Sequence, residues 1–399
     1  MTQTLPSLAQ EAWLNEPRLQ RLFAVLSETG GEGRVAGGAV RNALLGVAIA
    51  DIDIATTLTP QQVMLACRAA GFAVHPTGID HGTVTVVVER QPFEVTSLRQ
   101  DVATDGRHAQ VAFTSDWMTD ALRRDFTMNA LYCDAHGKLY DYTNGYRDLL
   151  ARRINFVGDA AARIREDYLR ILRFFRFHAR FGEGRPDERG LAACVALKTG
   201  IAGLSAERIR QELLKLLEAP GAVPTLMVMA ESGILAEIIP FTEQFAVLER
   251  LPRDGILRLA VLAAEPEQLK SRLRLANEEA ARIMSALNMP DVAPDMAAHE
   301  QRVLLYARGA QAWEDGVDIS WALSGAALDD GGWRALRDLP ERWITPRMPV
   351  TGQDLVGLGF PPGPLMGRTL RRLEQYWLDH DFAPTRRELL ALAKEGKDG

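Results

Sequence analysis

Two glycines, a short helical segment and a pair of aspartates follow one another near the start of the chain. Gly37-Gly38 forms a predicted turn, residues 39–45 a helix, and residues 49–55 a strand that carries Asp51 and Asp53. Side chains two positions apart on a strand point to the same side, so the two carboxylates would stand together. Such a pair is costly unless a cation lies between them, and Mg²⁺ prefers carboxylate and phosphate oxygens. The pattern therefore predicts a magnesium site with Asp51 and Asp53 as ligands.

The turn and the helix complete a phosphate-binding pattern. Glycine lets backbone N–H groups approach a phosphate, and the helix that follows presents its positive N-terminus. Gly38 lies at this point, and Arg41, about one helical turn further on, can add a charge-assisted contact to a triphosphate. A glycine pair or an Asp-x-Asp alone is usually an ordinary turn or a solvated strand edge. Their combination in this order favours the functional interpretation.

Predicted strands and helices alternate over about the first 150 residues. They comprise helices at 16–28, 60–70 and 120–131, strands at 34–35, 83–89, 93–98 and 130–133, a hairpin turn at Gln91-Pro92 and a polar loop at 101–115. From about residue 151 strand signals largely vanish and the apolar spacing becomes helical, most clearly at 168–181, 205–217 and 222–230. The sequence therefore predicts an α+β chain in which a mixed-sheet head precedes an all-helical part.

Composition excludes several classes of protein. No apolar run among the 399 residues is long enough to span a bilayer, and the start MTQTLPSLAQEAW does not fit a signal peptide. The three cysteines lack CxxC spacing, which argues against a disulfide framework or a zinc site, and no GxGxxG supports a Rossmann dehydrogenase. Because the formal net charge is −6, contact with nucleic acid would need a local basic face. We expect a cytoplasmic protein with no membrane segment and no obligate protein partner.

Eight segments carry a family resemblance. They are GGAVRNALLG (37–46), DIDIAT (51–56), HGTV (81–84), EVTSLR (94–99), RRDFTMNAL (123–131), DYTNGYRDL (141–149), EDYLRILRFFRF (166–177) and LSAERIRQELLKLL (204–217). In these segments and in their order, the chain resembles the class II CCA-adding enzymes and bacterial poly(A) polymerases of the polymerase-β-like nucleotidyltransferase superfamily. The resemblance implies an N-terminal helix packed on the head (1–32), a catalytic head (33–150), a neck with a nucleotide-selecting helix (151–220), a body (221–330) and a tail that contacts tRNA (331–399).

The resemblance also assigns roles to particular side chains. Glu94 would join Asp51 and Asp53 in the catalytic set. The residues implied to bind the nucleotide are Gly38, Arg41, Arg124, Asp125, Asn129, Asp167, Arg170, Arg173 and Arg176. Among these, Asp167 and Arg170 would select CTP and ATP by the edge of the base. Residues 204–217 would support the neck, with Ser205 as the N-cap of the helix.

Helical spacing supports the assignment at 166–177. Asp167, Arg170 and Arg173 would lie on one side of a single helix, with Arg176 slightly behind, while apolar residues such as Leu172 and Phe175 would face the core. A single Asp–Arg pair at this spacing would ordinarily be a surface ion pair. Three arginines in register with one aspartate favour a binding surface.

The implied function is template-independent addition of CCA to the 3′ end of tRNA from CTP and ATP, with Mg²⁺ as cofactor and pyrophosphate as product. The alternatives are a poly(A) polymerase on the same scaffold, an enzyme that adds only CC or only A, and, more remotely, a non-catalytic RNA-binding module. The chain departs from the family at Asn42, where Asp is more frequent, and in the loop at 101–116, where Arg107 is the single arginine. Basic residues near the C-terminus fit either RNA contact or a solvated helix face: Arg368, Arg371, Arg372, Arg386 and Arg387.

Overall fold

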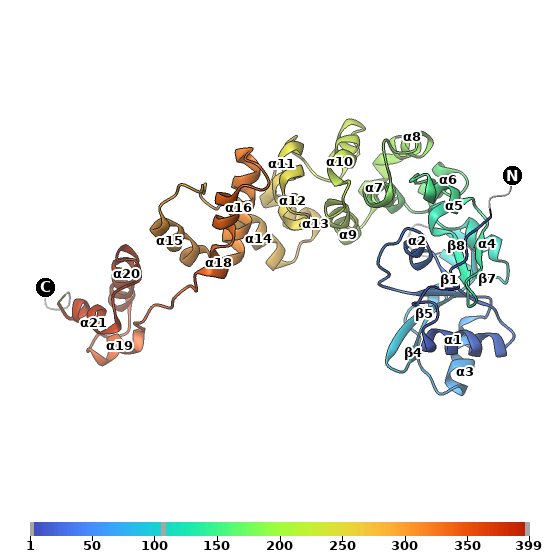
Figure 1. The fold of residues 1–399 in the computed structure, drawn as a ribbon, viewed down its shortest axis with the longest axis horizontal. Helices are drawn as coiled ribbons and strands as arrows, with labels where there is room; N and C mark the ends of the chain where they lie inside the picture. Colours follow the sequence, from blue (N-terminus) through green and yellow to red (C-terminus); the bar gives the residue numbers. More distant parts are fainter. Residues whose placement is uncertain (1–3, 105–108, 396–399) are drawn as a thin grey trace. The chain divides into compact units, whose positions relative to one another are not determined.

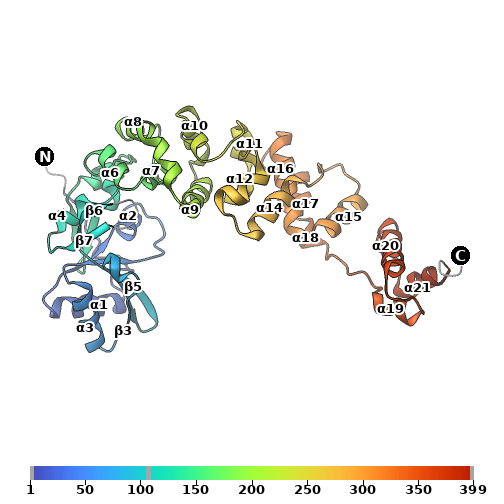
Figure 2. The ribbon, with the colours of Figure 1, turned by 180° about the vertical axis from the view of Figure 1, so that it is seen from behind.

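The computed structural model of the chain describes residues 4–104 and 109–395. The chain divides into two compact units. The first unit reaches to Pro240 and also includes Arg272–Arg274, and the second contains the other residues from Phe241 onward. The strands belong to the first unit, whereas the described part of the second unit is built of helices (Figures 1 and 2). The predicted α+β class, a mixed-sheet head before helices, is confirmed.

A seven-stranded mixed sheet forms the centre of the head. Its strands, in spatial order, are β3 (Ala73–His75), β4 (Thr83–Val88), β5 (Gln91–Ser97), β2 (Asp53–Thr56), β1 (Gly33–Ala36), β8 (Leu131–Asp134) and β9 (Leu139–Asp141). β2 pairs parallel with β5 and antiparallel with β1. The parallel pairing places Asp53, the first residue of β2, directly beside Glu94 in β5.

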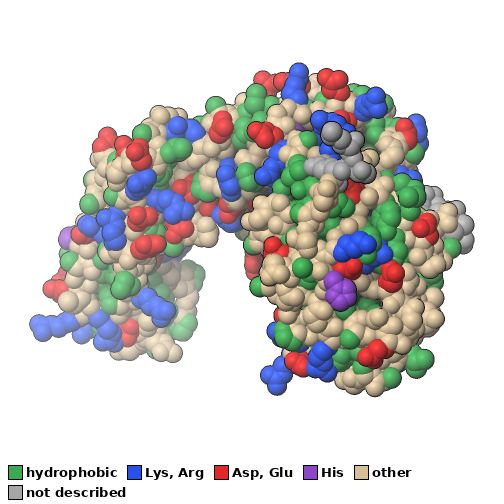
Figure 3. Space-filling view, turned by 45° about the vertical axis from the view of Figure 1, so that its right-hand side comes forward, with side chains coloured by type: hydrophobic (Ala, Val, Ile, Leu, Met, Phe, Trp, Pro, Cys, Tyr) green, Lys and Arg blue, Asp and Glu red, His purple; other side chains and the backbone are tan. Residues whose placement is uncertain are grey.

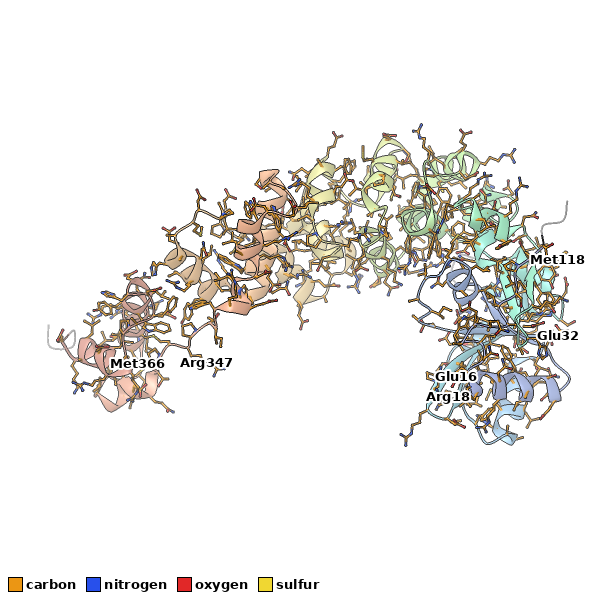
Figure 4. The ribbon with its side chains drawn as sticks, in the orientation of Figure 1. Glu16, Arg18, Glu32, Met118, Arg347 and Met366 are labelled. Carbon is orange, nitrogen blue, oxygen red and sulfur yellow. The ribbon has the colours of Figure 1, made fainter. Side chains whose placement is uncertain are left out.

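Helices α1 (Pro17–Glu28) and α3 (Pro60–Ala69) pack together, and α1 also contacts β1 and β4. The predicted start of α1 is confirmed, since Glu16 is the N-cap and accepts a hydrogen bond from the Leu19 amide. Glu16 and Arg18, both labelled in Figure 4, form an ion pair at this end of the helix. The apolar face of α1, which includes Leu22 and Leu26, is buried. The N-terminal helix is thereby fixed to the sheet.

The predicted strand at 49–55 is shorter than expected. β2 begins at Asp53, so Asp51 lies just before the strand and not on it. The strand does not begin earlier because neither neighbouring strand offers Asp51 a partner for backbone hydrogen bonds. The positions opposite Asp51 would be Gly38, which belongs to helix α2 (Gly38–Leu44), and Pro92, which has no N–H to donate.

The hairpin β4–β5 turns at Glu89-Arg90, so the predicted turn at Gln91-Pro92 is wrong. Both turn residues have positive φ, 48° and 71°, which gives the chain the twist that a two-residue hairpin needs. Pro92 is a strand residue opposite Val87. The parallel pairing of β5 with β2 begins only at Glu94, so the missing N–H of Pro92 costs no bond on that side.

The segment at 101–115 forms more structure than the predicted loop. β6 (Arg99–Thr104) and β7 (Ala109–Phe113) form an antiparallel two-stranded ladder, and Arg107 lies outside the described residues. The predicted helix at 120–131 is also wrong for most of its length. Helix α4 (Trp117–Leu122) starts earlier, because Asp116 caps it, and is followed by a single 3₁₀ turn before β8. The predicted strand near residues 130–133 is confirmed as β8.

Helices complete the first unit. They are α5 (Gly145–Leu150), α6 (Ala160–Glu166), α7 (Leu169–Phe181), α8 (Glu188–Leu197), α9 (Ala206–Leu217) and α10 (Ala222–Glu231), with the 3₁₀ turns η1 (Ile79–His81), η2 (Thr127–Asn129), η3 (Lys198–Gly203) and η4 (Leu235–Glu237). α7 packs against α9 and α10, and its predicted core residues, such as Leu172 and Phe175, are buried. Phe174 stacks on Phe156, and both rings adjoin Phe126, which follows the Arg-Arg-Asp segment. This aromatic cluster joins the first neck helices to the head.

The second unit contains helical layers with two apolar clusters. Its helices are α11 (Phe245–Arg250), α12 (Gly255–Leu262), α13 (Leu269–Leu273, shared with the first unit), α14 (Asn277–Leu287), α15 (Ala298–Arg308), α16 (Ala310–Ser324), α17 (Gly331–Arg337), α18 (Leu339–Arg342), α19 (Gly352–Gly357), α20 (Pro364–Asp379) and α21 (Arg386–Glu395), with the 3₁₀ turn η5 (Pro266–Gln268). Trp313 and Trp333 are buried in one cluster and Trp377 in the other, so these tryptophans are core residues. None of the helices formed by the described residues combines the length and apolar character needed for a membrane span.

At residues 272–274 the chain returns to the first unit. The Nε of Arg272 donates to the carbonyl oxygen of Ile238 at 2.7 Å, and the carbonyl oxygen of Arg274 accepts from Arg210 at 2.9 Å. These two hydrogen bonds tie a distant segment to the end of the neck.

Candidate active site

The three predicted catalytic carboxylates surround one cavity. Asp53 and Glu94 are direct neighbours in the parallel register of β2 and β5. Asp51 precedes β2, and all three side chains are exposed. Together with residues that include Trp13 and Thr85, they line a cavity of about 660 Å³. The structure thus places the three acids of the sequence-based prediction around a common space.

Partial desolvation and neighbouring carboxylates raise the pKa of Asp53. Loss of water around the carboxylate group is the largest cause, and the charges of Glu94 and Asp51 add to it, while Arg124 acts in the opposite direction. Such a concentration of negative charge suits a divalent cation. Among the described residues no three His, Cys, Asp or Glu side chains lie close enough to hold a metal by themselves. This donor set fits Mg²⁺, which is usually held by one or two carboxylates with phosphate oxygens and water.

A second cavity, of about 440 Å³, adjoins the first and shares Asp53 with it. It contains eight of the nine predicted nucleotide-binding residues: Gly38, Arg41, Arg124, Asp125, Asn129, Asp167, Arg170 and Arg173. Arg123 and Arg208 also line it. Cationic side chains therefore face a space that is bounded on one side by the carboxylate of Asp53.

Arg41 is a buried cation at the base of this second cavity. Its guanidinium donates to Asn129 Oδ1 at 2.5 Å and to Asn42 Oδ1 at 2.9 Å, and it lies over the Phe181 ring. Burial and the charges of nearby arginines, Arg176 foremost, lower the pKa of Arg41 to about 10. The negative charge of an anion in the cavity would counterbalance both effects. Asn42, where the family more frequently has Asp, acts here as a neutral acceptor for Arg41.

Asp125 connects the head to the neck. Its Oδ2 accepts from Arg173 at 2.5 and 2.8 Å, and its Oδ1 accepts from Asn129 Nδ2 at 3.0 Å. Burial raises the pKa of Asp125, but Arg173 and Asn129 outweigh it and leave the pKa below its usual range. Asp125 is therefore ionised, and the chain Arg41–Asn129–Asp125–Arg173 forms one continuous polar wall.

Asp167 lies before α7, so the prediction that it shares a helix face with the arginines is wrong. Its backbone is extended, with φ −157° and ψ 106°, which ends α6 one residue before α7 is capped by Tyr168. Its carboxylate accepts from the Leu169 amide at 3.1 Å and from Arg208 at 2.7 Å. Arg170, on α7, pairs with Glu166 at 2.6 Å. Both residues nevertheless line the second cavity.

Arg176 is the predicted binding residue that the structure does not place among the described residues lining the cavity. Its Nε lies 2.8 Å from the buried Glu212 carboxylate on α9, without the alignment of a hydrogen bond. The interpretation of residues 204–217 as neck support agrees with this ion pair. Ser205 is the N-cap residue as predicted, but in the described structure its side chain makes no capping bond.

Two residues near the cavity were missed by sequence reasoning. Asp120, on α4, is 1% exposed and holds both Arg123 and Arg124, and Tyr132, on β8, donates to it. The sequence does carry a signal for Asp120, because it lies three positions before Arg123 and four before Arg124, the spacing of helical ion pairs. Arg208 was counted with the neck, whereas it reaches Asp167 and lines the cavity. No sequence signal linked Arg208 to Asp167, because 41 residues separate them.

Two family models match this chain. Residues 33–155 match the model described as "Poly A polymerase head domain", and residues 185–245 match "Probable RNA and SrmB- binding site of polymerase A". Over 373 residues the chain is 36% identical to the mitochondrial CCA tRNA nucleotidyltransferase 1 of Danio rerio, covering 90% of this chain and 86% of that protein. The chain belongs to the CCA tRNA nucleotidyltransferase family. The family resemblance drawn from the eight segments is thereby confirmed.

Members of this family match along nearly the whole chain. The mitochondrial CCA tRNA nucleotidyltransferase 1 of Mus musculus is 33% identical over 410 residues, covering 96% of this chain and 93% of that protein. The solved structure of the Bacillus stearothermophilus CCA-adding enzyme in complex with CTP has a TM-score of 0.82 at 27% identity, covering 96% and 97% of the two chains. The match therefore extends beyond the catalytic head.

Proposed function

We propose that this protein adds C, C and A in turn to the 3′ end of tRNA, using CTP and ATP and releasing pyrophosphate. The observation that carries the proposal is the position of Asp53 between two cavities, one acidic and one rich in arginine. A triphosphate needs cations for its charge and carboxylates near its α-phosphate, and these two cavities supply both. Relatives that cover most of the chain carry the name CCA tRNA nucleotidyltransferase.

The chain's own residues divide the work of an in-line displacement at the α-phosphorus. Arg41 and Arg124 contact the phosphates or the sugar. Hydrogen bonds to Arg41 and Asp125 hold the Asn129 side chain in place. Glu94 orients the attacking 3′-hydroxyl from the neighbouring strand. Asp51 and Asp53 would hold Mg²⁺, which lowers the pKa of the hydroxyl and neutralises charge in the transition state when it is bound.

Asp167 and Arg170 select the base of the incoming nucleotide. One side chain accepts hydrogen bonds and the other donates them, so the pair presents a fixed pattern to the edge of a base. Arg208 holds Asp167 at 2.7 Å and Glu166 holds Arg170 at 2.6 Å. Because both are held by protein partners, their pattern is set before the nucleotide enters. CTP and ATP would match it, and GTP and UTP would not.

The face drawn in Figure 3 carries basic and acidic side chains interspersed over its described part. Recognition of tRNA would therefore depend on local groups of arginines. The Thermotoga maritima CCA-adding enzyme has been solved in complex with tRNA, and its likeness to this chain, with a TM-score of 0.67 at 19% identity, is one of fold. We place the reaction in the cytoplasm, where the three buried cysteines, which form no disulfide in the described structure, would remain reduced.

A tRNA that lacks its last three nucleotides tests the proposal. With labelled CTP alone we expect addition of two residues, with ATP alone none, and with both a product three residues longer. Extension by ATP alone into a long tail would instead identify a poly(A) polymerase. Arrest after two residues with both substrates, or addition of A only to a tRNA ending in CC, would identify a partial enzyme.

The carboxylates are tested in the same assay. We expect the double substitution Asp51→Ala with Asp53→Ala to abolish incorporation, because Mg²⁺ at the α-phosphate would lose its carboxylate ligands. Glu28→Ala, at the exposed end of α1, is the matched control and should leave the rate unchanged. Normal incorporation of CTP by the double variant would refute the mechanism.

A further inference from the structure

The Asp120 carboxylate accepts hydrogen bonds from four residues. Its Oδ1 accepts from Arg123 Nε at 2.8 Å and from the Arg99 backbone N–H at 3.4 Å, and it lies 2.6 Å from Arg123 Nη2. Its Oδ2 accepts from Arg124 Nη2 at 3.1 Å and Nε at 3.3 Å, and from the Tyr132 hydroxyl at 2.7 Å. The side chain is 1% exposed and lines neither of the two cavities described above. Asp120 therefore acts on the cavity only through the residues that it holds.

Arg124 is held in the plane of its guanidinium group. Besides Asp120, its Nε donates to the Tyr132 hydroxyl at 3.0 Å, and its Nη1 donates to the Asn129 carbonyl oxygen at 3.2 Å. The group also lies over the Tyr132 ring, 4.8 Å from its centre. A Cβ atom at Gly37 would come within 3.2 Å of Nη1, which explains the preference for glycine at this turn. The guanidinium is fixed between strand β8 and the glycine turn.

The hydrogen bonds of Arg124 to the protein use only some of its N–H groups. A guanidinium carries five N–H groups, one on Nε and two on each terminal nitrogen. Within the described structure, Nε serves Asp120 and Tyr132, one N–H of Nη2 serves Asp120 and one of Nη1 serves Asn129. One N–H on each terminal nitrogen therefore remains for a ligand in the second cavity, which Arg124 lines.

We propose that Asp120 is a positioning residue for nucleotide binding: it fixes the Arg124 guanidinium so that its two remaining N–H groups point at the nucleotide. The inference rests on the proposed function, because it takes a nucleoside triphosphate as the ligand of the second cavity. Asp120 touches neither substrate nor metal. Without it, Arg124 would keep its charge but lose its fixed orientation, and the bidentate contact depends on that orientation.

The alternative is that Asp120 only stabilises α4. The two roles differ in their dependence on Arg124. If Asp120 acts through Arg124, its loss matters while Arg124 is present and does nothing further once Arg124 is removed. A structural role would instead give losses that add. A double-mutant cycle of Asp120→Asn with Arg124→Ala separates the two, since non-additivity measures the dependence directly.

The variant Asp120→Asn keeps the volume and removes the charge. We expect kcat/KM for CTP and for ATP to fall about ten- to a hundredfold, the size of a lost charge-assisted hydrogen bond. The Arg124→Ala variant should show a comparable or larger loss, and the double variant should be no worse than Arg124→Ala. Asp116→Asn is the matched control: it lies on the same helix as the exposed N-cap and should leave kcat/KM unchanged.

Equilibrium binding of CTP to the same full-length variants separates failure of this inference from failure of the proposed function. Wild-type protein that binds CTP but does not extend tRNA would refute the proposed function and leave the positioning role to be judged from the dissociation constants. Wild-type protein that binds no CTP would overturn both. A folded Asp120→Asn variant with wild-type affinity, or losses that add in the cycle, would overturn the positioning role alone.

Burial of Asp120 creates a risk that Asp120→Asn does not fold. Tyr132→Phe then takes its place, because it removes one hydroxyl that bonds both Asp120 and Arg124 while it keeps the packed ring. We expect CTP binding to weaken about three- to tenfold in Tyr132→Phe, in keeping with one hydrogen bond, and no further change when it is combined with Arg124→Ala. An unchanged dissociation constant in Tyr132→Phe would contradict the proposal.

Discussion

We expect the substitution Glu212→Gln to destabilise the protein by removing a buried negative charge beside Arg176. The Glu212 side chain, on α9, is 8% exposed and lies 2.8 Å from Arg176 Nε and 3.8 Å from Arg173 Nη1. The Arg176 side chain is itself only 16% exposed. Burial lowers the pKa of Arg176, and neighbouring arginines lower it further, while Glu212 opposes both effects. Glutamine would leave Arg176 without the negative charge that lies nearest to it.

The magnitude follows from the geometry. Removing one partner of a fully buried ion pair costs about 3–5 kcal/mol. Three features reduce the value here: Arg176 keeps some contact with water, the two charged atoms are not aligned for a hydrogen bond, and glutamine retains the volume and one acceptor oxygen. We therefore expect a loss of about 2–3 kcal/mol, which corresponds to roughly 4–12 °C in melting temperature for a unit of this size.

Circular dichroism followed through thermal unfolding would measure the shift. The matched control is Glu207→Gln on the same helix, where Glu207 is half exposed and pairs with Arg274 at 3.5 Å. Exposed pairs contribute about 0–1 kcal/mol, so the control should shift by about 0–4 °C. Equal shifts in the two variants would show that burial does not set the cost. No shift in Glu212→Gln would refute the assignment of Glu212 as the counter-charge for Arg176.

Two further substitutions test the head. The pKa of Asp53 is raised in part by Glu94, and protons compete with a cation for this carboxylate below that pKa. Glu94→Gln should lower the pKa and so move the acidic limb of the normalised pH–rate profile to lower pH, and an unchanged limb would contradict this. A Cβ at Gly145 would lie 2.0 Å from the backbone oxygen of Thr127, so Gly145→Ala should cost at least about 2 kcal/mol in thermal or denaturant unfolding. A Gly145→Ala variant as stable as the wild type would show that the backbone of η2 can move away from the added methyl group.

The parts of the fold that repeat a simple period were predictable from the sequence. In β4 the residues Val84, Val86 and Val88 alternate with less buried ones, as the period of a half-buried strand requires. In α7 the apolar residues recur at helical spacing, so both its position and its buried side were predicted. The ordered motifs also placed most members of the site, because the residues that converge belong to segments with recognisable patterns.

The errors arose where pairing between distant segments decides the outcome. The start of β2 depends on what lies opposite Asp51, and no residue near Asp51 in the sequence indicates that Pro92 would lie there. The turn at Glu89-Arg90 requires two residues with positive φ, a conformation that neither Glu nor Arg predicts. Asp167 looked helical because helical residues flank it on both sides, although its own backbone is extended. Asp120 gains its role only when Tyr132 and both arginines fold around it.

The return of residues 272–274 to the first unit has a consequence for any attempt to divide the protein. A gene cut after Pro240 would remove the Arg272 side chain that donates to the Ile238 carbonyl oxygen and the Arg274 carbonyl oxygen that accepts from Arg210. Each of these two hydrogen bonds is worth about 1 kcal/mol, so the neck of such a fragment should unfold at a lower temperature than the neck of the intact protein. The first compact unit is therefore discontinuous in sequence, and a fragment that contains all of it must extend at least to Arg274.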